Sequence, residues 1–298
     1  AFAGNTNLIS LDKLVEDGWL TPQTLADVPD FPVNNVDYGP VINYHNNKLH
    51  LAYMRFKRSA TDEQRAALDV WCKDEAHWLD DWSLFFALKN EHGGRPWVEW
   101  EVGLALRDED ALQAARLRLA DEINKHRFLQ WLFHEQWYAL KAYANQRNIR
   151  LIGDIPIFVA HDSADVWSNR GEYYLDPKGN PEVIAGVPPD YFSPTGQRWG
   201  NPLYRWDMMA ANGYRWWIQR FETVLKQVDM VRVDHFRGFE AYWEIPASEE
   251  TAINGEWVAG PRARFFESLE IALGKLPIIA EDLGVITEGV VNLRDKFG

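Results

Sequence analysis

The pattern of apolar and polar positions divides the chain into a helical first half and a second half in which strands and helices alternate. Thr61 followed by Gln64 predicts a helix start, because this pair can satisfy the first backbone N–H groups of a helix. The helix-favouring residues that follow continue to Gly93 and Gly94, where a helix would end. Residues 108–146 again have apolar positions close to helical spacing. We therefore predict an α-rich subdomain at residues 59–147.

The second half predicts a parallel sheet, because apolar strands alternate with helical segments. The strands are expected at 148–159, 228–236 and 275–284, and the helices at 213–227, 261–273 and 287–297. Each strand carries an acidic residue toward its end, namely Asp154, Asp234 and Glu281. The carboxyl ends of parallel strands lie on one side of a sheet or barrel, so these side chains are expected to lie near one another.

Two other segments lack a long apolar period. Residues 1–58 are rich in Pro, Asn, Asp and Gly, with a short helix predicted at 14–20. Residues 160–205 form a connection far longer than the usual loop of about four to six residues. Because this connection is rich in Trp, Tyr and Phe, we predict a lid over a site at the strand ends.

Composition narrows the class of ligand. The 298 residues include 15 Trp, 15 Phe and 11 Tyr, and flat amphipathic rings suit stacking against sugars. A net charge of −13 argues against nucleic acid and anionic membranes as partners. The single cysteine, Cys72, excludes an intrachain disulfide and fits a reducing, cytoplasmic compartment. No apolar run reaches membrane-spanning length, no Cys/His pattern suggests a metal, and no cofactor is expected.

Carboxylates at a barrel mouth, with Arg and His beside them, suit cleavage of glycosidic bonds. One carboxylate attacks the anomeric carbon, and a second donates a proton to the leaving oxygen. In a retaining enzyme the two carboxyl groups lie about 5–5.5 Å apart, a separation that adjacent strand ends can supply. A nucleotide-sugar transferase is disfavoured, because no Gly-rich phosphate loop follows a strand.

Four stretches in order, together with the opening AFAGN, resemble the amylomaltases, which are 4-α-glucanotransferases of glycoside hydrolase family 77 in the α-amylase clan. The resemblance extends from the first residue to the last. The four stretches are GDIPIFVAHDSADVW, VPPDYFSPTGQRWGNPLYRW, VRVDHFRGFEAYWEIP and IIAEDLG.

The resemblance implies a role for each charged residue at the strand ends. Asp234 would be the nucleophile, held ionised by Arg232 on the same side of the strand, and Glu281 the general acid/base. Asp282 is also eligible as the acid, but is expected to support Glu281 by a hydrogen bond. His235 would bind a sugar hydroxyl or only end the strand, and Asp154 would bind sugar or hold the network; both questions stay open.

In the lid, five residues match the family's mobile loop over the donor and acceptor subsites: Asp190, Tyr191, Phe192, Gln197 and Trp199. A transferase must favour a sugar hydroxyl over water, so it needs a dry site that binds the acceptor well. The alternative is that Tyr191 and Phe192 fill an apolar groove and never touch substrate. For Trp97 and Trp100 we favour packing over a role as sugar platforms.

The resemblance also implies that this chain is an internal fragment. The fold class is then α/β, part of a TIM (β/α) barrel with barrel strands missing at both ends. Residues 1–58 would begin the barrel region, 59–147 form the α-rich insertion, and 148–298 hold the central strands and the lid. The family's third catalytic carboxylate, in a His-Asp-Asn motif, has no match after Glu281.

The leading hypothesis is transfer of segments of maltooligosaccharides, amylose or glycogen-derived glucans. The alternatives are a glucan hydrolase of the same clan and a catalytically silent glucan-binding fragment.

Overall fold

The computed structural model describes residues 1–281 and 283–298. By their contacts they form two compact units. The helical unit comprises Ala3–Glu91 and Gln113–Ala142, and the sheet unit comprises Ala1–Phe2, His92–Leu112 and Tyr143–Gly298.

The helical unit contains only helices among its described residues. The capping box predicted at Thr61 is confirmed at the start of α3 (Asp62–Asp74). The Gln64 N–H donates to Thr61 Oγ1 at 3.2 Å, and the Thr61 N–H donates to Gln64 Oε1 at 2.9 Å. The helix-favouring run after it divides into two helices at Glu75. The helices are α1 (Leu11–Glu16), α2 (Tyr38–Ser59), α3 (Asp62–Asp74), α4 (Ala76–Glu91), the end of α6 (Glu109–Arg118) and most of α7 (Ala120–Asn145), with 3₁₀ turns η1 (Thr6–Leu8) and η2 (Pro22–Leu25).

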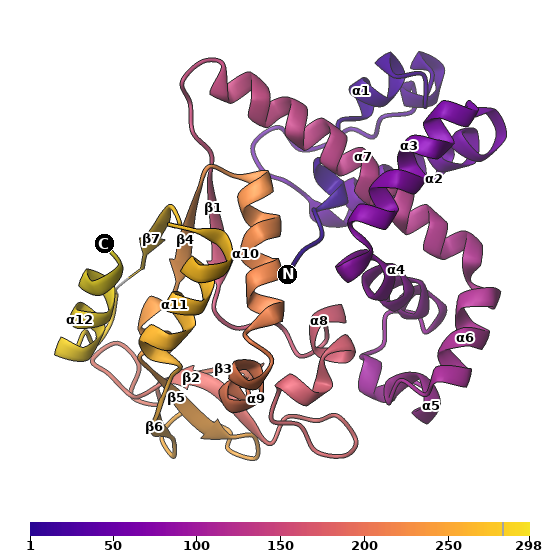
Figure 1. Ribbon diagram of the computed structural model, residues 1–298. Coiled ribbons are helices and arrows are strands. Elements are labelled where there is room, and N and C mark those ends of the chain that lie inside the picture. The colour runs from indigo at the N-terminus through magenta and orange to yellow at the C-terminus, as the bar shows by residue number, and fades with distance from the viewer. Residues whose placement is uncertain (282) are drawn as a thin grey trace. The chain divides into compact units, whose positions relative to one another are not determined.

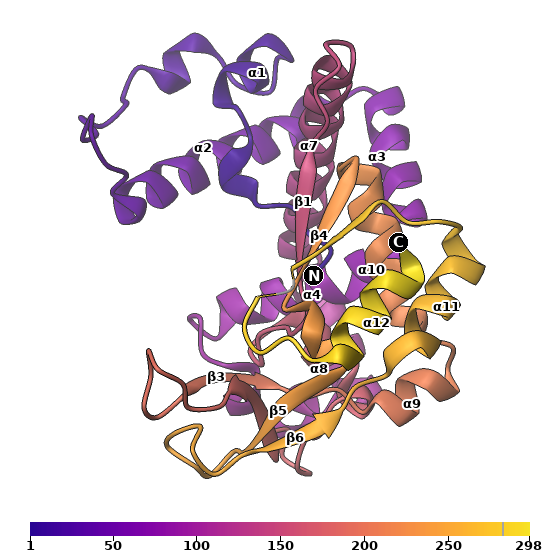
Figure 2. The same ribbon diagram turned by 90° about the vertical axis from the view of Figure 1, so that its left-hand side faces the viewer.

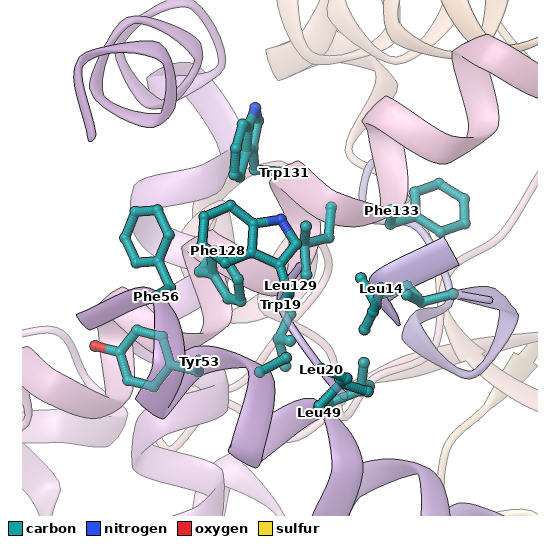
Figure 3. Packing of buried hydrophobic residues seen from close by; sticks show 13 residues of the cluster. Leu14, Trp19, Leu20, Leu49, Tyr53, Phe56, Phe128, Leu129, Trp131 and Phe133 are labelled. Carbon is teal, nitrogen blue, oxygen red and sulfur yellow. The ribbon is translucent and has the colours of Figure 1, made fainter. Parts of the chain in front are cut away.

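An aromatic core holds this unit together (Figure 3). Phe56 from α2 packs on Phe128 from α7, with ring centroids 4.6 Å apart. Trp19, in the turn after α1, packs at 5.4 Å from Phe56 and 6.0 Å from Phe128. Phe128 is fully buried. Aromatic pairs of this kind add about 0.5–1.5 kcal/mol each beyond the area they bury. These contacts explain why α2, which the sequence pattern did not predict, is a helix of 22 residues.

The sheet unit contains a parallel sheet in the order β1-β4-β7, as expected from the alternation of strands and helices. Asp154 is the register partner of Arg232, and Pro156 is that of Asp234. On the neighbouring strand, Val233 is the register partner of Ala280, the residue before Glu281. The strands are β1 (Ile152–Pro156), β4 (Met230–Asp234) and β7 (Ile278–Ala280).

Helices cover one face of this sheet, where α10, α11 and α12 lie side by side (Figures 1 and 2). Val231 and Val233, on alternate positions of β4, are fully buried. The intervening residues Arg232 and Asp234 therefore project from the opposite face. The helices of the unit are α5 (Val102–Ala105), α8 (Ala164–Ser168), α9 (Trp206–Ala211), α10 (Arg215–Gln227), α11 (Arg262–Leu273) and α12 (Glu288–Phe297), with 3₁₀ turns η3 (Trp97–Glu99), η4 (Arg170–Glu172) and η5 (Phe236–Phe239).

A second, antiparallel sheet in the order β3-β2-β5-β6 lies on the side where the parallel strands end (Figures 1 and 2). Two of its strands come from the segment predicted to be a lid, which is therefore more regular than expected. The other two were not predicted. The strands are β2 (Val183–Val187), β3 (Gln197–Pro202), β5 (Ala241–Pro246) and β6 (Glu256–Ala259). In neither unit is a described helix long and apolar enough to cross a membrane.

Candidate active site

Three charged side chains meet at the ends of β1 and β4. Arg232 donates from Nε to Asp154 Oδ1 at 2.8 Å and from Nη2 to Asp154 Oδ2 at 3.2 Å. The same Nη2 donates to Asp234 Oδ1 at 2.9 Å. One guanidinium therefore bridges two carboxylates, and the hydrogen bond with Asp154, with the negative charge of the nearby carboxylates, raises the pKa of Arg232. All three side chains are 41–49% exposed, so solvent and ligands can reach them.

Glu281 is fixed beside them by the turn that follows β4. Its N–H donates to Val233 O at 3.0 Å, and its carbonyl accepts from the Phe236 N–H at 3.1 Å. Its side-chain Oε2 accepts from the His235 N–H at 2.9 Å. Because neighbouring strands lie about 4.8 Å apart, this pairing suits the ~5–5.5 Å carboxyl separation of a retaining glycosidase.

His235 has an unusual conformation for a residue that is not glycine. Its φ of 53° and ψ of 48° lie in the left-handed region. Its ring lies 4.9 Å from that of Trp199 and 6.4 Å from that of Phe158. Burial, with a smaller contribution from Arg237, lowers the pKa of His235 to about 4. The imidazole is therefore neutral near pH 7.

Two aromatic residues that support this turn, Phe158 and Trp257, were not predicted from the sequence. The buried Arg237 guanidinium lies 3.7 Å from the ring centroid of Trp257 on β6, and its Nη1 donates to Val285 O at 2.8 Å. Arg237 thus connects the chain after Glu281 to the antiparallel sheet. Trp257 follows no motif and pairs with β5 across a long loop, so sequence spacing gave no indication of its place.

The five lid residues lie on and before β3. Asp190 accepts from the backbone N–H groups of Phe192 at 2.9 Å and Ser193 at 2.7 Å, so its carboxylate shapes the loop. Tyr191 and Phe192 are 104% and 97% exposed, and so do not fill an apolar groove in this structure. The Trp199 Nε1–H donates to Gln197 Oε1 at 3.0 Å.

Glycines hold both ends of this loop. A Cβ at Gly186 would overlap Gln197 O, and one at Gly196, where φ is +67°, would overlap Val187 O. Only a residue without a side chain fits either place.

The remaining predicted residues are Asp282, Trp97 and Trp100. Asp282 lies outside the described residues. Trp97 and Trp100 are buried, as the packing interpretation predicts, and the Trp97 Nε1–H donates to His161 O at 2.8 Å. Within the described ranges, no group of three or more His, Cys, Asp or Glu side chains is placed to bind a metal ion.

Comparison with known proteins identifies the family of the chain. The family described as 4-alpha-glucanotransferase, glycoside hydrolase family 77, matches residues 1–298. The chain is 52% identical over 298 residues to a 4-alpha-glucanotransferase of Thermus thermophilus and 48% identical over 299 residues to one of Synechocystis, in both cases covering all of this chain and 59% of the relative.

A structural relative supports the expected fold. The amylomaltase from Streptococcus agalactiae in complex with acarbose superposes with a TM-score of 0.95 at 37% identity, covering 100% of this chain and 60% of that one. The expected α/β class, with part of a TIM barrel and an α-rich subdomain, is thereby confirmed. By its sequence over every residue and by its fold, the chain belongs to glycoside hydrolase family 77, the 4-alpha-glucanotransferase family.

Proposed function

We propose that the protein to which this chain belongs is a retaining 4-α-glucanotransferase. It moves a segment of a 1,4-α-glucan to the 4-hydroxyl of glucose or of another glucan. The observation that carries the proposal is the Asp154–Arg232–Asp234 cluster with Glu281 fixed on the next strand.

In the first step Asp234 attacks the anomeric carbon, and the glycosidic bond breaks as Glu281 gives its proton to the leaving oxygen. Arg232 keeps the nucleophile ionised and oriented, since its fork contacts both neighbouring carboxylates. In the second step the acceptor 4-hydroxyl gives its proton to Glu281 and attacks the same carbon, which releases Asp234. Two inversions retain the α-configuration.

The exposed Tyr191 and Phe192 support the choice of a sugar over water in the second step. We assign Tyr191 and Phe192 to contacts with the bound glucan, because rings on a loop beside the site can stack on sugar faces and exclude water. Gln197 and Trp199 form the base of this loop, and Asp190 keeps its turn. Asp154 acts mainly through Arg232.

The substrates we propose are maltooligosaccharides, amylose and glycogen-derived glucans. The acidic surface and the single Cys72 support a cytoplasmic protein that acts on neutral polysaccharide.

The test is incubation of the full-length protein with maltotriose, following chain lengths and total reducing ends. The expected result is a ladder of longer and shorter glucans at constant reducing ends, absent in the Asp234→Asn variant. Rising reducing ends would indicate a hydrolase instead. Binding of maltooligosaccharide without any change in length would contradict both activities.

A further inference from the structure

We propose that His235 is a positioning residue: its backbone N–H orients Glu281, and its ring couples that carboxyl group to Trp199 at the base of the loop. This inference rests on the proposed function, because it concerns proton transfer by Glu281.

The left-handed turn at His235 is what aims the N–H at the neighbouring strand. Asp234 ends β4, and the next residue reverses the chain, so that one short turn carries the nucleophile and also contacts the acid. A residue with a side chain adopts this left-handed conformation only at an energetic cost. The bonds from Phe236 N–H and from Glu281 N–H on either side hold the turn in that conformation.

The contact distinguishes the two oxygens of Glu281. The His235 N–H, a donor only, lies 2.9 Å from Oε2, so Oε2 accepts in both protonation states. This contact favours a proton on Oε1 when Glu281 is protonated, because the carbonyl oxygen of a carboxylic acid accepts a hydrogen bond better than its hydroxyl oxygen does. No described side chain or backbone group donates to Oε1, so this oxygen can face the glycosidic oxygen.

The ring of His235 is confined by its neighbours. Trp199 meets it edge-on at 4.9 Å and an interplanar angle of 82°, and Phe158 lies 6.4 Å away. Gly238 lies behind it, because a Cβ added there would be 3.0 Å from His235 Cδ2. Its Nε2 is buried and has no hydrogen-bond partner in the described part of the chain. Packing against Trp199, rather than a polar bond, therefore fixes the ring and through it the turn.

This arrangement predicts a defect that depends on the leaving group. The matched donors are maltotriose, whose leaving sugar needs a proton, and α-maltosyl fluoride, whose fluoride leaves with little protonation. We compare kcat/KM for each donor in the full-length protein, because this quantity reports only the steps through formation of the glycosyl-enzyme. The variant is His235→Asn, since asparagine tolerates the left-handed region and keeps the N–H while losing the ring contact.

With maltotriose we expect kcat/KM to fall roughly ten- to a hundredfold, part of the ~10²–10⁴ that a positioned acid contributes. With the fluoride we expect less than about a threefold fall, since little proton donation is required. His161→Asn is the control, because His161 packs on Trp97 at 5.3 Å and its Nε2–H donates to the Gly179 carbonyl at 2.7 Å rather than to the carboxylates. It should leave the ratio of the two donors unchanged.

A second variant keeps the test decisive if His235→Asn does not fold. Gly238→Ala pushes a methyl group toward the His235 ring and toward Ile157, while no proposed site residue is itself replaced. It should give the same leaving-group dependence to a smaller degree. Equal losses with both donors, or no loss, would overturn the positioning role while leaving the proposed function intact. A wild-type protein inactive on both donors would overturn the proposed function itself.

Discussion

Two groups of carboxylates, one in each unit, differ in the number of cationic partners that they have. In the helical unit Asp121 accepts from Lys57 and Tyr53, and the Lys57 bond is the main cause of its lowered pKa. Glu122 beside it has His126, Lys125 and Asn90 as partners, and its pKa is also lowered, chiefly by the bond with His126. Each of these two carboxylates has at least one cationic partner of its own.

At the strand ends the carboxylates outnumber their cationic partners. Asp154 and Asp234 share the single cation Arg232, and Glu281 has only a backbone N–H from the described residues. The cluster at the strand ends therefore keeps negative charge that is neutralised at Asp121 and Glu122. A surplus of this kind costs stability, but it suits a transition state with positive charge on the sugar ring.

The largest effect is expected at Asp234, where a substitution tests the contrast between the two groups of carboxylates most directly. Asp234→Asn keeps the shape beside Arg232 but removes the nucleophile, so we expect initial rates of glucan transfer to fall by ~10⁴-fold or more. The matched change in the helical unit, Asp121→Asn, should leave the rate within about twofold, as an exposed pair. A loss of less than tenfold at Asp234 would show that another group is the nucleophile.

In the helical unit the largest effect is expected from the core rather than from charge. Phe128→Ala removes a fully buried ring between Phe56 and Trp19, and should lower the free energy of unfolding by about 3–5 kcal/mol. Urea denaturation of the full-length protein measures this. Leu140→Ala on the same helix, at a 52% exposed position, should change it by less than ~0.5 kcal/mol. Similar values for both variants would contradict the packing described.

The shared cation gives the next test. Arg232→Lys keeps the charge but lacks the planar fork that binds both oxygens of Asp154 while contacting Asp234, so the transfer rate should fall about 10²-fold with little change in stability. Lys57→Met, which removes a cation from the exposed pair with Asp121, should leave the rate unaltered and cost less than ~1 kcal/mol. If lysine supports the full rate at position 232, the bidentate contact is not needed.

The smallest effect concerns pH. The pKa of His235 is about 4 in the folded protein and about 6.5 in an unfolded chain, so the unfolded state binds more protons between these values. Its contribution to stability is complete above about pH 6.5 and is lost as the pH falls toward 4. The difference in unfolding free energy between wild type and His235→Asn should therefore shrink from pH 7 to pH 5. A difference that does not vary with pH would mean that the imidazole is not buried as described.

The sequence predicted those parts in which local pattern and tertiary structure agree. The parallel strands were predicted because apolar runs alternate with helical segments, and the start of α3 because Thr61 and Gln64 form a local cap. Helix α2 was missed because its first turns contain Gly39, Pro40 and several Asn residues. It is stabilised instead by Leu49, Tyr53 and Phe56 packing in the core.

The rest depended on contacts between distant residues or on uncommon backbone. Strands β5 and β6 pair through Trp243 and Trp257, whose rings lie 5.3 Å apart, and neither strand has a long alternating pattern. The left-handed turn at His235 could not be predicted, because the preference of histidine for the left-handed backbone region is too weak to indicate it. The contacts of Glu281 with the N–H groups of His235 and Phe236 depend on that turn, so they could not be predicted either.

The loop between β2 and β3 also has a consequence for how the family can diversify. Its tip at Tyr191 and Phe192 touches almost nothing, whereas Gly186 and Gly196 at its ends admit no side chain. Substitutions at the tip are therefore nearly free of a folding penalty, while those at the two ends are not. Selection for new acceptors, in nature or in a mutant library, can therefore change Tyr191 and Phe192 at little cost in stability. Gly186 and Gly196, which set the backbone of the loop, must be kept.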